Sequence, residues 1–138
     1  MRTKSVLDKI LDEASIFHCH VGPFLALGLK AGLRAIEVFG YNPHDMIAEI
    51  VVPEKKTPYT CFADGVQFVT GCTLGKGNIR IEDGGCLKAV FMQGSRSLEL
   101  KVRKEILDEL RKSSKDLEEI ARKLMNANLS KLFEEKLL

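Results

Sequence analysis

The spacing of apolar residues in the first third of the chain predicts two helices. Over residues 4–16, apolar side chains recur every three or four positions, which is the period of an amphipathic helix. Residues 24–38 are apolar on nearly every side, and Pro23 directly before them suits the first turn of a helix. We therefore expect a surface helix followed by a buried central helix.

The middle of the chain alternates between strand and helix patterns. A β-branched segment that ends at a proline predicts a strand over residues 46–52. Residues 61–70 predict a helix that begins after Thr60 and ends at Gly71. Three more segments alternate apolar and polar residues between glycine turns, and these are residues 78–82, 86–92 and 98–102. We expect the strands to form an antiparallel meander.

The last third of the chain predicts two charged amphipathic helices, over residues 103–112 and 114–127. We expect these helices to pack on the sheet or on a partner chain. Together the elements predict an α+β fold, in which an antiparallel sheet packs against the buried central helix and flanking helices. Residues 1–138 are expected to form one domain, with the C-terminal helices starting near residue 103.

Composition and charge narrow the classes of function. The formal net charge is only +2, so the chain has no basic footprint for nucleic acid. Charged residues interrupt the apolar stretch of residues 23–39, which argues against a membrane span, and acidic residues near the start argue against a secretory signal. We therefore expect a cytoplasmic protein whose four cysteines are thiols or metal ligands rather than disulfides.

Two segments that lie far apart in the sequence carry reactive side chains. The first contains His18, Cys19 and His20, and the second is a glycine-rich loop around Cys72. Alternate residues of an irregular or extended backbone share a face, so both imidazoles can reach one metal ion. Zinc and similar transition metals accept imidazole and thiolate together. The candidate ligands are therefore His18, His20, Cys61 and Cys72, with zinc as the expected metal.

One geometric objection applies to this four-ligand set. Cys61 and Cys72 flank one predicted helix. Ten helical residues place the two ends about 15 Å apart. Both thiols can therefore bind one ion only if the helix ends early or a second subunit contributes.

The glycine-rich loop also supports an alternative, in which the protein is a thiol enzyme. Cys72 would be its catalytic nucleophile or redox centre, and His18 or His20 would be the base. The loop would bind an anionic ligand through Lys76 and the backbone, and the residues concerned are Gly71, Thr73, Gly75, Lys76 and Asn78. It is not a nucleotide-binding P-loop, because the glycine spacing is one residue too short and Gly77 replaces the Ser or Thr that holds magnesium.

Two further questions stay open at the level of sequence. Asp64 and Gln67 lie one turn apart on the predicted helix, and they either face solvent or line the site. A third class of function is a binding or scaffold module that recruits a partner through the C-terminal helices.

Taken together, these motifs resemble the core of the FmdE family, which takes its name from a subunit of formylmethanofuran dehydrogenase. The resemblance covers roughly residues 15–105, and the segments that carry it are residues 18–23, Cys61, Asp64, Gln67 and the run 70–78, in which residues 71–78 are the most specific part. It implies an α+β core domain that forms a homodimer, with a metal or reactive-thiol site made by the histidine pair and the loop cysteine. It also implies an accessory or stand-alone role in molybdenum or tungsten enzymes or in one-carbon metabolism, with a larger enzyme complex as a further partner.

Two features set the chain apart from the usual pattern of that family. Members generally carry glycine between the histidines and cysteine just before the proline, whereas this chain has Cys19 and Gly22. Many members also end in a zinc ribbon with paired CxxC motifs, whereas this chain has no cysteine after Cys86. The resemblance is therefore to the core domain without the C-terminal zinc ribbon.

Overall fold

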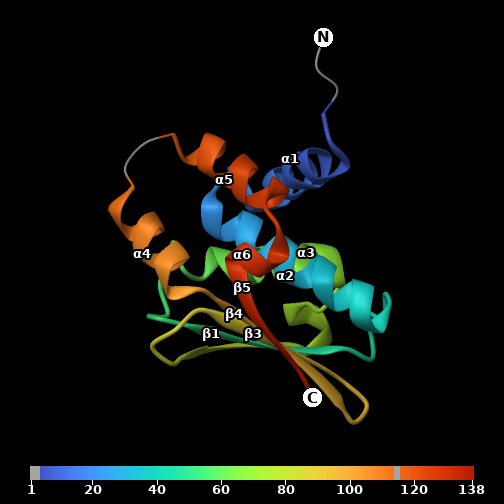
Figure 1. Cartoon of the computed structure of the whole chain (residues 1–138). Helices are drawn as coiled ribbons and strands as arrows, with labels where there is room; N and C mark the ends of the chain where they lie inside the picture. The colour runs from blue at the N-terminus through green and yellow to red at the C-terminus, as the bar shows by residue number, and fades with distance from the viewer. Residues whose placement is uncertain (1–3, 114–115) are drawn as a thin grey trace.

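Helices and one sheet are stacked in layers in the computed structural model, which describes residues 4–113 and 116–138 (Figure 1). The helices are α1 (Val6–His18), α2 (Pro23–Phe39), α3 (Cys61–Thr70), α4 (Lys104–Lys112), α5 (Leu117–Asn126) and the short α6 (Leu129–Leu132), with a 3-10 turn, η1 (Leu74–Lys76). The strands are β1 (Ile47–Val52), β2 (Ile79–Asp83), β3 (Lys88–Gln93), β4 (Arg96–Val102) and β5 (Phe133–Leu137). Helices α2 and α3 lie between the sheet and the outer pair α1 and α5.

The α+β class and the buried central helix are confirmed, and the expected elements lie close to their predicted positions. The helix expected over 114–127 begins at Leu117, and residues 114–115 lie outside the described part of the chain. The sequence pattern does not predict α6 or β5. In β5 only Phe133 is buried and the four residues after it are exposed, so this strand lacks the alternation by which strands are recognised.

The expected antiparallel meander is wrong in one respect. The strand order is β2-β1-β3-β4-β5, so β1 lies between β2 and β3, and it pairs with β2 in parallel. The other neighbours are antiparallel, which makes the sheet mixed. Burial explains the order: Ala48, Ile50 and Val52 of β1 are fully buried, whereas Arg80 and Glu82 of β2 are exposed and suit an edge strand.

Helix α2 forms the centre of the core, as its apolar residues predict. Leu25 and Leu29 have no exposed surface. The helix meets α3 at two glycines, because a Cβ atom on Gly28 would collide with the carbonyl oxygen of Phe62, and one on Gly65 would collide with that of Leu25. The two backbones are therefore in direct contact, which fixes the position of α3 against α2.

No individual helix within residues 4–113 and 116–138 combines the length and the apolar character that crossing a bilayer requires. Helices α1 and α2 meet that test only as a pair, and the pair is bent by 118° at its break.

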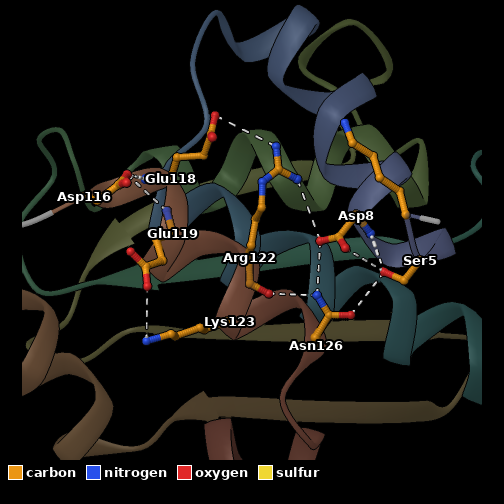
Figure 2. Close-up of a pocket in the computed structure, with 9 residues that line it drawn as sticks. Ser5, Asp8, Asp116, Glu118, Glu119, Arg122, Lys123 and Asn126 are labelled. Carbon is orange, nitrogen blue, oxygen red and sulfur yellow. Dashed lines mark hydrogen bonds and ion pairs between the residues drawn. The ribbon is translucent and has the colours of Figure 1, made fainter. Parts of the chain in front are cut away.

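An open pocket of about 760 Å³, lined by charged and polar residues, lies between α1 and α5 (Figure 2). Arg122 of α5 reaches α1, where its Nη2 lies 2.7 Å from Asp12 Oδ1. Asn126 Nδ2 donates to Asp8 Oδ1 at 3.1 Å, and Lys123 pairs with Glu119 within α5. These ion pairs and hydrogen bonds join the two outer helices to each other.

Candidate metal centre

The end of α1 brings two histidines together. Cys19 caps the helix in the left-handed conformation, with φ 78°, and its N–H donates to the Ser15 carbonyl at 2.7 Å. Non-glycine residues rarely adopt this conformation, which reverses the chain sharply. The rings of His18 and His20 consequently lie with their centroids 4.7 Å apart. Gly22 leaves space for the second ring, since a Cβ atom there would lie 2.9 Å from His20 Cε1.

Cys61, the first residue of α3, joins the two histidines. Tyr59, just before it, packs its ring edge-to-face on Phe24 at the start of α2, with centroids 5.4 Å apart. One donor atom from each of His18, His20 and Cys61 lies within 4.8 Å of the other two. Cys61 is buried and His20 is exposed, so this His/Cys cluster is anchored in the protein and open to solvent on one side.

Asp64 fixes the orientation of the His18 ring. Its Oδ2 lies 2.5 Å from His18 Nδ1. An ionised carboxylate only accepts hydrogen bonds, so in a neutral imidazole the ring proton lies on Nδ1 and Nε2 carries a lone pair. That Nε2 atom is buried and has no hydrogen-bond partner among the residues that the structure describes. Buried polar atoms are normally paired, and an unpaired imidazole nitrogen beside a second imidazole and a thiol fits a metal ion.

The surroundings of Cys61 favour a protonated thiol in the absence of a metal ion. Burial raises the pKa of its thiol, and the negative charge of Asp64 raises that pKa further. Such a thiol stays protonated at neutral pH unless positive charge approaches it. A divalent ion beside the histidines would supply this charge. Two imidazoles and one thiolate form a donor set that suits zinc and related transition metals.

Cys72, which was expected to be a ligand or nucleophile, lies outside the His/Cys cluster. It is fully buried, and its Sγ donates to the Met46 carbonyl at 3.4 Å. No hydrogen bond joins it to His18 or His20 in the described ranges. Burial also raises the pKa of its thiol. Helix α3 runs its full predicted length, so Cys61 and Cys72 lie at its opposite ends, and Cys72 has no exposed surface. A role of Cys72 as ligand or nucleophile stays a prediction.

The glycine-rich loop, residues 70–78, uses its polar groups to hold its own shape. Lys76 Nζ donates to the Gly71 carbonyl at 2.8 Å and to Thr73 Oγ1 at 3.2 Å. Asn78 Nδ2 donates to the Met46 carbonyl at 3.0 Å, and its Oδ1 accepts from Thr73 N at 2.9 Å. These bonds occupy side chains that were expected to bind an anion, and anion binding by the loop stays a prediction.

Asp64 and Gln67, whose place the sequence left open, belong to the site. Gln67 Nε2 donates to Asp64 Oδ1 at 3.3 Å, and Gln67 Oε1 accepts from Leu74 N at 3.1 Å. The signal in the sequence is their spacing, since Cys61, Asp64 and Gln67 are each three residues apart and follow one side of α3.

Known proteins share this fold and parts of this sequence. A crystal structure of a tungsten formylmethanofuran dehydrogenase FmdE-like protein from Syntrophus aciditrophicus has a TM-score of 0.65 and 17% sequence identity, and the match covers 100% of this chain and 77% of that one. At this identity the likeness shows the fold alone. A protein of Archaeoglobus fulgidus, named a probable S-adenosyl-L-methionine-binding protein, is 36% identical over 84 residues, which are 59% of this chain. The matched part is 23% of that relative, so the chain spans less than a quarter of its length.

A protein-family model gives the assignment. The family is described as "FmdE, Molybdenum formylmethanofuran dehydrogenase operon", and its model matches residues 17–137. This range contains the His/Cys cluster, the glycine-rich loop and every strand of the sheet. The match covers most of the chain, and the chain therefore belongs to the FmdE family.

Proposed function

We propose that this protein binds one divalent transition metal ion per chain, through His18, His20 and Cys61. The observation that carries the proposal is His18 Nε2, which is buried with no hydrogen-bond partner in residues 4–113 and 116–138, while Asp64 holds the other ring nitrogen. The short distances within the His/Cys cluster support it. Three protein ligands leave a fourth position open, as in zinc sites that hold water or an exchangeable molecule.

Zinc is the metal that we propose for this site. When bound, it would supply Lewis-acid chemistry, polarising a water or carbonyl oxygen at the open position. The residues of the chain have separate tasks: Asp64 orients one imidazole, the Cys61 thiolate offsets part of the ion's charge, and the exposed His20 lies on the solvent side. For the whole protein we propose an accessory or stand-alone role connected with formylmethanofuran dehydrogenase, supported by its family.

The proposal is tested by the metal content of untagged protein prepared without chelators and then given excess zinc and desalted. We expect about one equivalent of zinc per chain in the wild type. A His18→Ala variant should retain much less than one equivalent, because the remaining two ligands bind weakly. A His44→Ala variant is the matched control, since His44 is a surface histidine outside the His/Cys cluster. No stoichiometric metal in the wild type, or equal metal in all three proteins, would sink the proposal.

We also propose that the chain forms a homodimer through the apolar surface beside the His/Cys cluster. Phe17 and Phe68 lie with ring centroids 6.2 Å apart, yet they are 58% and 36% exposed, and Leu74 is 85% exposed. Large apolar side chains grouped on a surface mark contact sites. Sedimentation velocity should give a dimer for the wild type and for Leu117→Ser, and a monomer for Phe17→Ser with Phe68→Ser. A monomeric wild type would contradict the proposal.

A further inference from the structure

Gln67 lies between the His/Cys cluster and the glycine-rich loop and bonds to both sides. Its amide nitrogen donates to Asp64 Oδ1, and Asp64 Oδ2 holds His18 Nδ1. Its amide oxygen accepts from the backbone nitrogen of Leu74, in η1. A continuous series of hydrogen bonds therefore runs from the loop backbone to an imidazole of the cluster.

The chemistry of its two neighbours fixes the direction of the Gln67 amide. A backbone N–H can only donate, so the side-chain oxygen must face Leu74, and an ionised carboxylate can only accept, so the side-chain nitrogen must face Asp64. Glutamine satisfies both neighbours at once. Glutamate would keep the bond to Leu74 but place a second negative charge beside Asp64, and leucine would lose both bonds.

The loop end of this series is held rigidly. Asn78 Nδ2 donates to the Pro43 carbonyl at 2.7 Å and to the Met46 carbonyl at 3.0 Å, just before β1. Its Oδ1 accepts from Thr73 N at 2.9 Å, next to the Leu74 nitrogen that Gln67 uses. The Leu74 amide is thereby tied to the residues just before β1. The loop acts as a fixed point for the side chains of α3.

At the other end of the series, the Asp64 carboxylate needs a partner that holds it in place. The Asp64 side chain is 37% exposed, whereas that of His18 is 9% exposed. A carboxylate with this much access to water has a broad choice of χ2 angles and of hydrogen-bond partners. The bond from Gln67 to Oδ1 restricts this choice and keeps Oδ2 on the imidazole.

We infer that Gln67 is a positioning residue for the metal site, which acts through Asp64 and transmits the fixed position of the glycine-rich loop to the His18 ring. This inference rests on the proposed function, because it assigns a role toward the proposed ion. It also gives residues 70–78 a task other than metal ligation or catalysis. Residues that orient ligands in this way typically change metal affinity by about 10- to 100-fold.

A double-mutant cycle on zinc affinity tests whether Gln67 acts through Asp64. Asp64→Asn should weaken zinc binding by nearly 100-fold, about the largest loss that is usual for a residue that orients a ligand. Gln67→Leu should weaken it by about tenfold. The double variant should bind zinc no more weakly than Asp64→Asn alone. Gln67 acts by positioning the Asp64 carboxylate, so its loss has no further effect once that carboxylate is gone. Losses that multiply in the double variant would overturn the inference.

A second measurement needs no metal and therefore separates this inference from the proposed function. Long-range ¹H–¹⁵N NMR of the metal-free wild type should show His18 protonated at Nδ1. Gln67→Leu and the same-sized Gln67→Glu should both give a mixture of tautomers. Lys101→Gln is the matched control, since Lys101 is an exposed residue of β4 outside both the glycine-rich loop and this series of hydrogen bonds, and it should leave the tautomer unchanged. A wild-type tautomer in both Gln67 variants would refute the role of Gln67, even if zinc binding itself is established.

Discussion

A Cys61→Ser variant is expected to bind Co²⁺ at least about 100-fold more weakly than the wild type, the upper end of the loss seen for outer-shell changes. Cys61 supplies the only thiolate of the proposed ligand set, and a serine hydroxyl is a poor replacement for it. Absorption spectroscopy during a Co²⁺ titration measures the affinity and shows the thiolate-to-cobalt charge-transfer band. This band should be present in the wild type and absent in Cys61→Ser.

Cys72→Ser is the matched control for this experiment, since Cys72 is also buried and lies at the other end of α3. It should keep both the affinity and the charge-transfer band, because its Sγ is bonded to the Met46 carbonyl rather than to the His/Cys cluster. Circular dichroism checks that both variants fold. Loss of the band in Cys72→Ser with retention in Cys61→Ser would reverse the assignment of the thiol ligand.

A Gly65→Ala variant is expected to be destabilised by about 3 kcal/mol, the upper part of the usual range for overpacked cores. The added methyl group would collide with the Leu25 carbonyl and lie 2.6 Å from Leu29 N, and backbone atoms of a central helix cannot move aside cheaply. The better helix propensity of alanine, about 1 kcal/mol, offsets only part of this cost. Urea unfolding followed by circular dichroism gives the change in the free energy of unfolding.

Gly75→Ala serves as the control for Gly65→Ala. A Cβ atom at Gly75 has only Thr73 Oγ1 near it, at 4.0 Å, so this change should be nearly neutral. Because the contact of α2 with α3 sets the position of Cys61, folded Gly65→Ala should also bind metal more weakly than the wild type. A fully stable Gly65→Ala variant would contradict the direct backbone contact of the two helices.

The sequence is sufficient to predict most elements of this fold, but not the order of its strands. Helix α3 has the predicted bounds. It ends at Gly71, which adopts the left-handed conformation of a C-cap because this signal is local, whereas Thr60 precedes the helix without capping it through its side chain. The placement of β1 between β2 and β3 depends on which strand is most buried, and local alternation carries no information on pairing partners. Strand β5 is held by its pairing with β4 and by one buried residue, Phe133, so no pattern of its own reveals it.

The candidate site is also only partly visible in the sequence. The histidine pair is recognisable because both residues lie in one short motif, and Cys61 because of its place at the start of a predicted helix. Cys72 is predicted as a reactive residue because a thiol in a glycine-rich loop is typical of a reactive site, but burial is a tertiary property, and in this fold the side chain is fully buried outside the His/Cys cluster. The role of Asp64 depends on how α1 lies against α3, which is a tertiary contact that spacing alone does not give.

X-ray absorption spectroscopy of the zinc-loaded wild type tests the proposed ligand set most directly. The extended fine structure should contain one sulfur at about 2.3 Å, and nitrogen or oxygen ligands at about 2.0 Å that include two imidazoles. The proposed ligand set assigns the single sulfur to Cys61 and the two imidazoles to His18 and His20. A spectrum without sulfur, or with two sulfurs per zinc, would contradict this account of the metal centre.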